Sequence, residues 1–180
     1  MTRIVLTYED FVALPDDGNR YELHEGELSV TRAPGRRHQQ ILLKLALNVA
    51  PYIESRRLGE FYVAPFDCIM TNITVVEPDL VYVDAERLRL LQERGLESAP
   101  TLAVEIISPY TGRIDRRRKM DLYARHDVTW YWIVDPDPRT IEAYHLQARA
   151  YRLEARLEGP TPVGLPPFPD LLLDSAAIWS

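Results

Sequence analysis

Cysteine and long apolar runs are almost missing from this chain of 180 residues. The single cysteine, Cys68, excludes an intramolecular disulfide, and no spacing of Cys and His residues is typical of a zinc site. No segment approaches the roughly 18 uninterrupted apolar residues that a membrane span needs, and the amino terminus has no signal-peptide pattern. We therefore expect a soluble, cytoplasmic protein without a membrane partner.

Two motifs of large enzyme classes are also missing. The chain has only 8 Gly residues, and no Gly-x-x-x-x-Gly-Lys loop that would cradle a nucleoside triphosphate. There is no Gly-x-Ser-x-Gly turn, and neither Cys68 nor Ser108 has a His and an acid at a recognisable spacing. Nucleotide-driven motors and hydrolases with a Ser or Cys nucleophile are therefore unsupported.

Positive charge is in the minority, and lysine is nearly absent. The net charge is −6, which argues against a general nucleic-acid coat, because such binding depends on neutralising phosphates. A nucleic-acid partner would need a local basic patch. Only Lys44 and Lys119 are lysines among 21 basic residues, and all the others are arginines.

Hydrophobic periodicity predicts one domain, spanning residues 1–180, of the α/β or α+β class. Strand patterns flank Glu25-Gly26, which indicates an amino-terminal hairpin. We expect one central sheet of mixed direction, flanked by helices. Expected strands are 20–24, 27–31, 60–64, 66–70, 78–83, 102–107, 129–134, 140–144 and 151–157, and expected helices are 6–11, 38–57, 85–94 and 114–125. Pro51 should kink or break the second of these helices.

Two of the expected strands each carry one carboxylate. Glu105 interrupts the apolar run 102–107, and Asp79 lies at the start of the run 78–83. Removing a carboxylate from water costs several kcal/mol unless a cation or a set of donors compensates it. A helix-sized segment separates the two acids, so their strands can lie side by side. Together they predict a site for a hard divalent cation, Mg²⁺ or Mn²⁺, completed by water and phosphate oxygens.

A lysine close to such carboxylates would complete the site. Side chains two apart on a strand share a face, but the residue two positions after Glu105 is Ile107. Lys119 precedes Leu122 and Tyr123 by three and four residues, so its stem should share their inward-facing side of the helix. Its amine could then reach back toward the strand.

Several short motifs together form a family pattern. They are Pro78-Asp79, Val104-Glu105-Ile106-Ile107-Ser108-Pro109, Asp115 through Lys119, Leu122-Tyr123-Ala124, Tyr131-Trp132-Ile133-Val134-Asp135-Pro136, Tyr21-Glu22-Leu23, Gly26-Glu27-Leu28 and Arg37-His38-Gln39. On these motifs, over nearly its whole length, the sequence resembles the Uma family of putative restriction endonucleases, a branch of the PD-(D/E)XK nuclease superfamily. The resemblance implies a restriction-endonuclease-like core with an added amino-terminal hairpin.

The resemblance also implies roles for individual residues. Asp79 and Glu105 become metal ligands, and Lys119 takes the place of the strand lysine that the wider superfamily has two residues after its glutamate. Glu22 becomes an additional acidic member of the site. We add the carbonyl of Ile106 as a further metal ligand.

These observations predict a Mg²⁺- or Mn²⁺-dependent endonuclease that acts on double-stranded DNA. Because two strands require two active sites, we expect a homodimer. Lys119 would position water or stabilise the developing charge on the phosphate. The candidate contacts to nucleic acid are His38, Arg113, Arg116, Arg117 and Arg118.

Each residue also has a structural explanation. Pro-Asp is common turn chemistry, and Glu105 could belong to a buried ion pair with an arginine. Lys119 and Glu22 could face solvent, and His38 could lie near a helix start merely for capping. Two alternative functions follow: a nuclease fold that no longer cuts and serves as a binding or scaffold protein, and a structural interaction protein.

Overall fold

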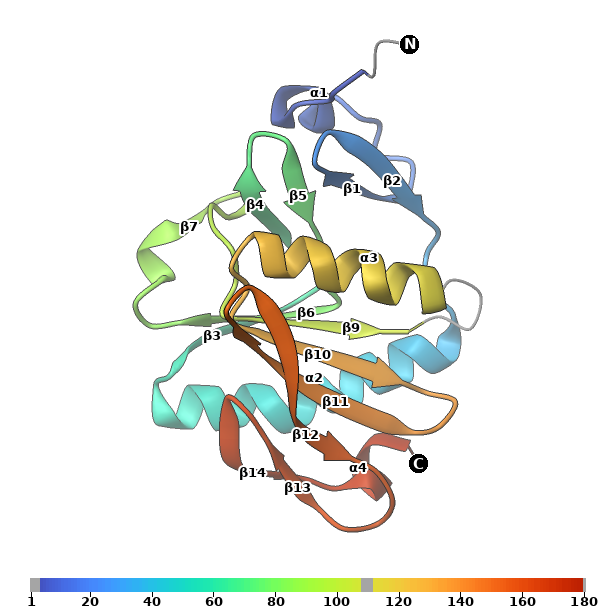
Figure 1. Cartoon of the computed structure of the whole chain (residues 1–180), viewed down its shortest axis with the longest axis vertical. Helices are drawn as coiled ribbons and strands as arrows, with labels where there is room; N and C mark the ends of the chain where they lie inside the picture. Colours follow the sequence, from blue (N-terminus) through green and yellow to red (C-terminus); the bar gives the residue numbers. More distant parts are fainter. Residues whose placement is uncertain (1–3, 108–111, 180) are drawn as a thin grey trace.

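A mixed sheet forms the centre of the computed structural model, which describes residues 4–107 and 112–179, without the side chains of 113–115 (Figure 1). The strand order of this main sheet is β12-β11-β10-β9-β6-β3. Strands β9 and β10 are parallel, and the other neighbours are antiparallel. The strands are β3 (Gly59–Val63), β6 (Leu80–Asp84), β9 (Leu102–Ile106), β10 (Trp130–Asp135), β11 (Thr140–Gln147) and β12 (Ala150–Leu157).

Helices cover both faces of the main sheet and create two cores. Helix α2 (Arg36–Arg56) packs on one face and α3 (Gly112–Arg125) on the other (Figure 1). On β9, Val104 belongs to the core with α2, whereas Ala103 belongs to the core with α3. Because successive side chains of a strand point to opposite faces, Glu105 is directed to the α3 side.

A second sheet lies above α3 in Figure 1 and has the order β2-β1-β5-β4-β8-β7. Its residues Cys68, Val76 and Leu96 share the core of α3. The strands are β1 (Arg20–His24), β2 (Glu27–Thr31), β4 (Asp67–Thr71), β5 (Thr74–Val76), β7 (Leu91–Gln92) and β8 (Gly95–Leu96). The turn between β1 and β2 has positive φ at Glu25 (52°) and Gly26 (82°), as a two-residue hairpin turn requires.

The ends of the chain complete the layers. Thr7 and Asp10 form a reciprocal capping pair that begins α1 (Tyr8–Val12). Near the carboxyl end, β13 (Val163–Leu165) pairs with β14 (Phe168–Leu173), and α4 (Ser175–Trp179) follows. These elements close the core of α2. No helix among the described residues is long and apolar enough to cross a membrane.

The structure confirms the α+β class, the amino-terminal hairpin and the adjacency of the two acid-bearing strands, since β6 pairs with β9. The predicted helix at 85–94 is wrong. That segment forms a short 3-10 turn, η1 (Leu88–Leu90), and then β7, because Arg87 is bound by Asp84 and Thr101 and β7 pairs with β8. The second sheet was not expected.

Pro51 does not break its helix, so of the two predicted effects, a kink or a break, the break does not occur. Helix α2 continues through Pro51 to Arg56. Val49 and Ile53, on either side of the proline, are fully buried in the core. Their packing outweighs the backbone hydrogen bond that proline cannot donate.

Candidate active site

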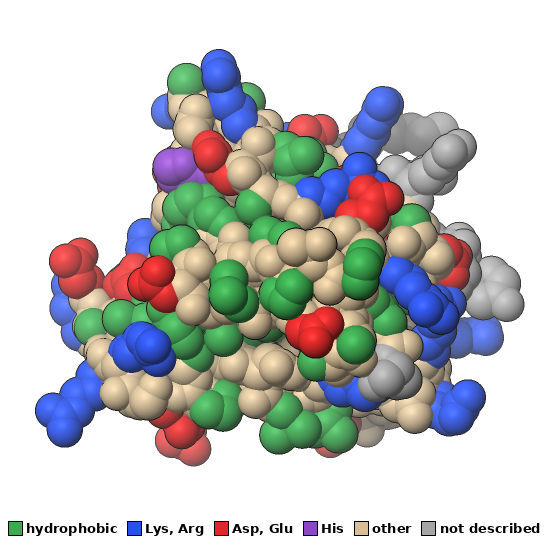
Figure 2. All heavy atoms as spheres, turned by 90° about the horizontal axis from the view of Figure 1, so that it is seen from below, with side chains coloured by type: hydrophobic (Ala, Val, Ile, Leu, Met, Phe, Trp, Pro, Cys, Tyr) green, Lys and Arg blue, Asp and Glu red, His purple; other side chains and the backbone are tan. Residues whose placement is uncertain are grey.

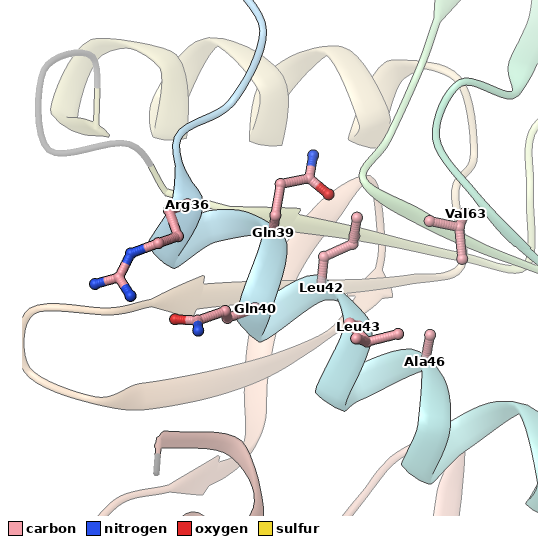
Figure 3. Close-up of a pocket in the computed structure, with 7 residues that line it drawn as sticks. All are labelled: Arg36, Gln39, Gln40, Leu42, Leu43, Ala46 and Val63. Atoms are coloured by element: carbon pink, nitrogen blue, oxygen red, sulfur yellow. The ribbon is translucent and has the colours of Figure 1, made fainter.

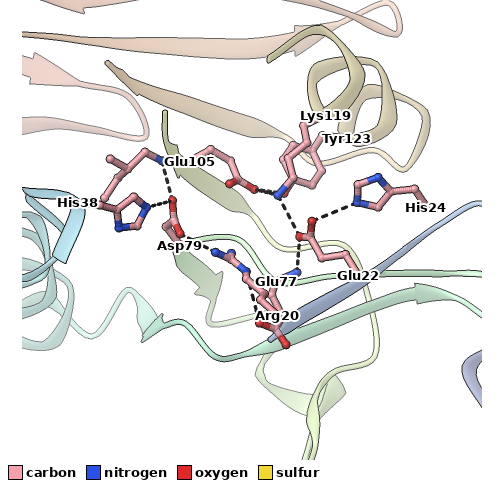
Figure 4. A network of polar contacts seen from close by, with 10 residues as sticks. Arg20, Glu22, His24, His38, Glu77, Asp79, Glu105, Lys119 and Tyr123 are labelled. Atoms are coloured by element: carbon pink, nitrogen blue, oxygen red, sulfur yellow. Dashed lines mark hydrogen bonds and ion pairs between the residues drawn. The ribbon is translucent and has the colours of Figure 1, made fainter. Parts of the chain in front are cut away.

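Three donors surround the carboxylate of Asp79 (Figure 4). The backbone N–H of Ile106 donates to Oδ2 over 2.7 Å, and Nε2 of His38 lies 3.0 Å from the same oxygen. Nη1 of Arg20 donates to Oδ1 over 2.9 Å. Burial raises the pKa of Asp79, but His38 and Arg20 outweigh burial and hold that pKa below its ordinary value. Asp79 is therefore an ionised carboxylate in a nearly dry setting.

Glu105 points from β9 toward α3. Its Oε1 accepts hydrogen bonds from Nζ of Lys119 over 2.7 Å and from the hydroxyl of Tyr123 over 2.5 Å. Burial raises the pKa of the Glu105 carboxyl, Lys119 opposes this, and nearby carboxylates such as Asp79 add to it, so that the net pKa is above its ordinary value. A bound cation would reverse this balance by favouring the ionised form.

Lys119 joins the acids of the two sheets. Its Nζ also donates to Oε1 of Glu22 over 3.0 Å. The same oxygen accepts from the backbone N–H of Glu77, and Oε2 of Glu22 lies 3.2 Å from Nε2 of His24. Burial raises the pKa of Glu22, but Lys119 and His24 outweigh it, and the pKa falls well below its ordinary value. Burial lowers the pKa of Lys119, but Glu105 and Glu22 outweigh it and raise that pKa, so Lys119 is a fixed positive charge.

Arg20 lies between the same groups of acids (Figure 4). Besides its bond to Asp79, its Nε lies 3.4 Å from Oε2 of Glu77. Its Nη2 is buried and has no hydrogen-bond partner among the described residues. Burial lowers the pKa of Arg20, but the surrounding carboxylates, Asp79 foremost, outweigh burial and raise it far above its ordinary value. Arg20 is therefore a second fixed cation.

The site lies at the junction of the two sheets because of how the chain crosses between them. Strand β5 belongs to the second sheet and β6 to the main sheet, and residues 77–79 connect them. Strand β1 contributes alternate residues, Arg20, Glu22 and His24, which share one face of the strand. Helix α3 closes the other side with Lys119. The site therefore requires both sheets and α3.

The structure brings together the predicted acids Glu22, Asp79 and Glu105 with Lys119. Glu105, whose side chain is 12% exposed, has Lys119 as its ion-pair partner, rather than the arginine of the structural alternative. Ile106 turns its N–H toward Asp79, and in an extended strand the carbonyl of the same residue points to the same side. The catalytic and metal-binding roles of these residues stay predictions.

The predicted basic run does not form one free patch. Arg116 pairs with Glu142 of β11, and Arg118 pairs with Glu27 of β2 at 3.0 Å. Arg117 is exposed on α3. The side chain of Arg113 lies outside the described residues. His38 lies beside Asp79, and its contact to phosphate stays a prediction.

Sequence reasoning missed Arg20, Glu77 and His24 as members of this network, and noted Tyr123 only as an inward residue. A signal for two of them exists in the polar residues that alternate along one face of β1. Glu77 had a weaker signal, since it only precedes Pro78-Asp79.

The donor chemistry of this site fits a hard divalent cation. Asp79, Glu105 and Glu22 supply carboxylate oxygens, and Ile106 supplies a carbonyl, which are the ligands that Mg²⁺ prefers, with water or phosphate oxygens completing the shell. Among the described residues, no three His, Cys, Asp or Glu side chains already form a group that could hold an ion. Asp79 has donors on both oxygens, whereas the described contacts of Glu105 both fall on Oε1.

An open groove of about 410 Å³ runs beside the site, between α2 and β3 (Figure 3). Gln39 in this groove follows His38, and Val63 pairs with Leu80, the residue after Asp79. Polar groups lie toward one end of the groove and apolar ones toward the other. Its lining residues are Arg36, Gln39, Gln40, Leu42, Leu43, Ala46 and Val63.

Glu77 gives a pH prediction. Burial raises its pKa, Arg20 opposes this, and Asp67 adds to it, so that the pKa rises from 4.5 to about 7. The folded protein therefore keeps a proton that the unfolded chain has already lost, so this contribution to stability is complete below pH 4.5 and declines as the pH rises to 7. We expect Glu77→Gln to reduce this decline, as measured by urea unfolding between pH 5 and 8 with EDTA. An identical decline in wild type and variant would contradict the assignment.

Comparison with known proteins gives the family and the fold of this chain. The model of a protein family described as "Uma2: Putative restriction endonuclease" matches residues 8–176. A similar solved structure is described as a putative nuclease belonging to DUF820 from Anabaena variabilis; the TM-score is 0.79, with 21% sequence identity and 97% of each chain covered. At this identity the likeness shows the fold, and it confirms the expected nuclease-like architecture. Among curated proteins, none matches the chain.

Proposed function

This chain belongs to the Uma2 family of putative restriction endonucleases, and on that premise we propose that it is a metal-dependent DNA endonuclease. One observation carries the proposal: Nζ of Lys119 lies within 3.0 Å of both Glu22 and Glu105, and Glu105 is on β9, which pairs with the strand that follows Asp79. A buried and a largely buried carboxylate that share one lysine, beside a third acid, are costly to stability alone and are typical of functional sites.

Each residue has a chemical role in this proposal. Asp79, Glu105 and the carbonyl of Ile106 hold Mg²⁺ or Mn²⁺. A bound cation of this kind polarises the phosphodiester and lowers the pKa of its water. Hydrolysis adds the water oxygen to phosphorus and breaks the bond to the leaving sugar oxygen. Lys119 keeps its proton, so it stabilises the negative charge that develops on the phosphate, and Glu22 holds Lys119 in place or binds a second ion.

Nucleic acid binds at the edge of the main sheet in this proposal, where His38, at the start of α2, lies beside Asp79. The end of the molecule opposite the second sheet, seen from below, mixes hydrophobic side chains with both signs of charge, and Lys and Arg gather mainly at its margin (Figure 2). That end therefore offers no central basic patch for phosphates among the residues that the structure describes. Arg117 and the polar end of the groove, with Arg36 and Gln39, are the described candidates near the site.

The protein acts on double-stranded DNA as a homodimer in this proposal, because cutting both strands calls for two active sites. Sedimentation equilibrium should give a mass of twice 20.8 kDa. In the presence of a DNA duplex and Ca²⁺, the complex should have the mass of two chains plus the mass of the duplex. A strictly monomeric mass under both conditions would contradict the dimer.

One observation favours a second candidate, a nuclease fold that binds without cutting. Arg20 already compensates the charge of Asp79, and Nε2 of His38 lies 3.0 Å from its other oxygen, as in a site that works without metal. The two functions differ in their response to Mn²⁺, which only the nuclease needs to bind.

Supercoiled plasmid tests the proposed function. Wild type with Mg²⁺ or Mn²⁺ should produce nicked and then linear DNA, and EDTA should prevent both. Lys119→Ala should cut far more slowly, because the fixed charge at the phosphate is lost. DNA affinity should also rise with divalent metal, since the buried carboxylates repel phosphate until a cation compensates them. No cleavage by wild type with either ion, on several duplex and single-stranded substrates, would exclude the enzyme and leave the binding protein.

A further inference from the structure

The guanidinium of Arg20, a residue of the second sheet, already lies next to Asp79. Nη1 of Arg20 lies 2.9 Å from Oδ1, and the Asp79 side chain is only 3% exposed. The guanidinium does not depend on Asp79 alone, because its Nε lies 3.4 Å from Oε2 of Glu77. Arg20 therefore has one partner inside the candidate metal site and one beside it.

Two nitrogens of this guanidinium are left without a hydrogen-bond acceptor. Nε and Nη2 of Arg20 are both buried and lack a hydrogen-bond partner among the described residues, because Nε and Glu77 are at an ion-pair distance only. A buried donor without an acceptor destabilises the state in which it occurs. This indicates that the guanidinium does not use its full hydrogen-bonding capacity while it is bound to Asp79.

A divalent cation and Arg20 cannot both compensate Asp79 at short range. Like charges a few ångströms apart in a nearly dry site repel strongly, and Asp79 carries a single negative charge. Glu77, in contrast, lies outside the ligand set of Asp79, Glu105 and Ile106. Its carboxyl can keep the guanidinium close by after it leaves Asp79.

We infer that Arg20 is an internal counter-ion that holds Asp79 in place before a metal binds, and that the metal displaces it from Asp79 toward Glu77. The inference rests on the proposed metal site. Arg20 is then a positioning residue rather than a ligand. It keeps the acidic cluster folded without metal, and its competition weakens the binding of the first cation.

Calorimetric titration with Mn²⁺ tests this inference on wild type, Arg20→Gln and Arg20→Lys. Arg20→Gln should bind Mn²⁺ about tenfold tighter, within the usual range of coupling between two ligands of one protein. Arg20→Lys, which keeps the charge, should stay close to wild type. Arg156→Gln serves as a control, because Arg156 is 42% exposed and pairs with exposed Glu158. If Arg20 has only a structural role, its replacement should weaken Mn²⁺ binding. Equal or weaker Mn²⁺ binding by Arg20→Gln would therefore overturn the inference.

Thermal unfolding gives a second measure of the displacement of Arg20 by the metal. In EDTA, Arg20→Gln should melt below wild type, because Asp79 loses its counter-ion, and saturating Mn²⁺ should narrow the difference. A difference that stays constant would contradict the displacement.

The wild-type protein provides a test that does not depend on a variant that folds poorly. The side-chain N–H signal of Arg20 in NMR spectra, identified by its absence in Arg20→Lys, should shift in step with Mg²⁺ saturation. A signal that stays unchanged through saturation would overturn the inference. Failure of the proposed function is distinguishable, since plasmid cleavage can be absent while Mn²⁺ still displaces Arg20, or present while Arg20 does not respond. Absence of Mn²⁺ binding to both wild type and Arg20→Gln overturns both.

Discussion

Asp79→Asn is expected to lower the rate of Mg²⁺-dependent plasmid cleavage by about 10³-fold or more, because a charged ligand of the cation contributes several kcal/mol to the transition state. The variant should also lose Mn²⁺ binding in calorimetry. Asn keeps the size of the side chain and one oxygen that can accept from the N–H of Ile106. We therefore expect the fold to survive, which circular dichroism can verify.

Asp137→Asn is the matched control for this change. Asp137 is 64% exposed and pairs with Arg37, which is also exposed, so the same loss of one negative charge occurs at a position in contact with solvent. Its cleavage rate and Mn²⁺ affinity should equal those of wild type. Wild-type cleavage by Asp79→Asn would remove Asp79 from the metal site and would require another set of ligands.

Lys119→Met is expected to lower the free energy of unfolding by roughly 3–5 kcal/mol in metal-free buffer, the range for removing one partner of a buried ion pair. Without the amine, Glu22 and Glu105 lie close together with no shared cation. One of them should then bind a proton, which raises its pKa in the folded state. Because stability falls as the pH rises through such a raised pKa, the loss should grow with pH. Urea unfolding in EDTA at several pH values measures it.

Arg118→Met is the control on the same helix. Arg118 and its partner Glu27 are 43% and 55% exposed, and a surface pair of this kind contributes only about 0–1 kcal/mol. Adding Mg²⁺ should restore part of the stability of Lys119→Met, because a ligand that binds only the folded state stabilises it. Equal losses in the two variants would mean that Lys119 is a solvated residue without a place in the cluster.

Local patterns in the sequence were sufficient for the acids of the main sheet. Glu105 is a lone carboxylate in an apolar strand, and Asp79 lies just before another, so both the strands and their adjacency could be predicted. Lys119 could be placed because the spacing to Leu122 and Tyr123 fixes its side of α3. Each of these predictions depends on residues close together in the sequence.

The contributions of the second sheet could not be predicted in the same way. Arg20 reaches Asp79 across 59 positions of sequence, from a strand of the second sheet to the segment that connects the two sheets. Strands β7 and β8 have two residues each, too few to show a period. The helix predicted at 85–94 is wrong because the pairing of β7 with β8 outweighs the helix propensity of the segment. The arginine run was predicted to contact nucleic acid, and the ion pairs of Arg118 with β2 and of Arg116 with β11 could not be foreseen from the sequence.

The alternation of side chains along β9 has a consequence for how the chain folds. A slip of one position along β6 and β10 would turn Glu105 into the layer of Trp132 and Ile41 and set Val104 beneath Lys119. That misaligned sheet would leave an acid among aliphatic neighbours and an amine without its anion, an error of several kcal/mol. Glu105, which we propose as a metal ligand, thus also disfavours a misaligned sheet. A chain with this misalignment would lose stability and the candidate site together.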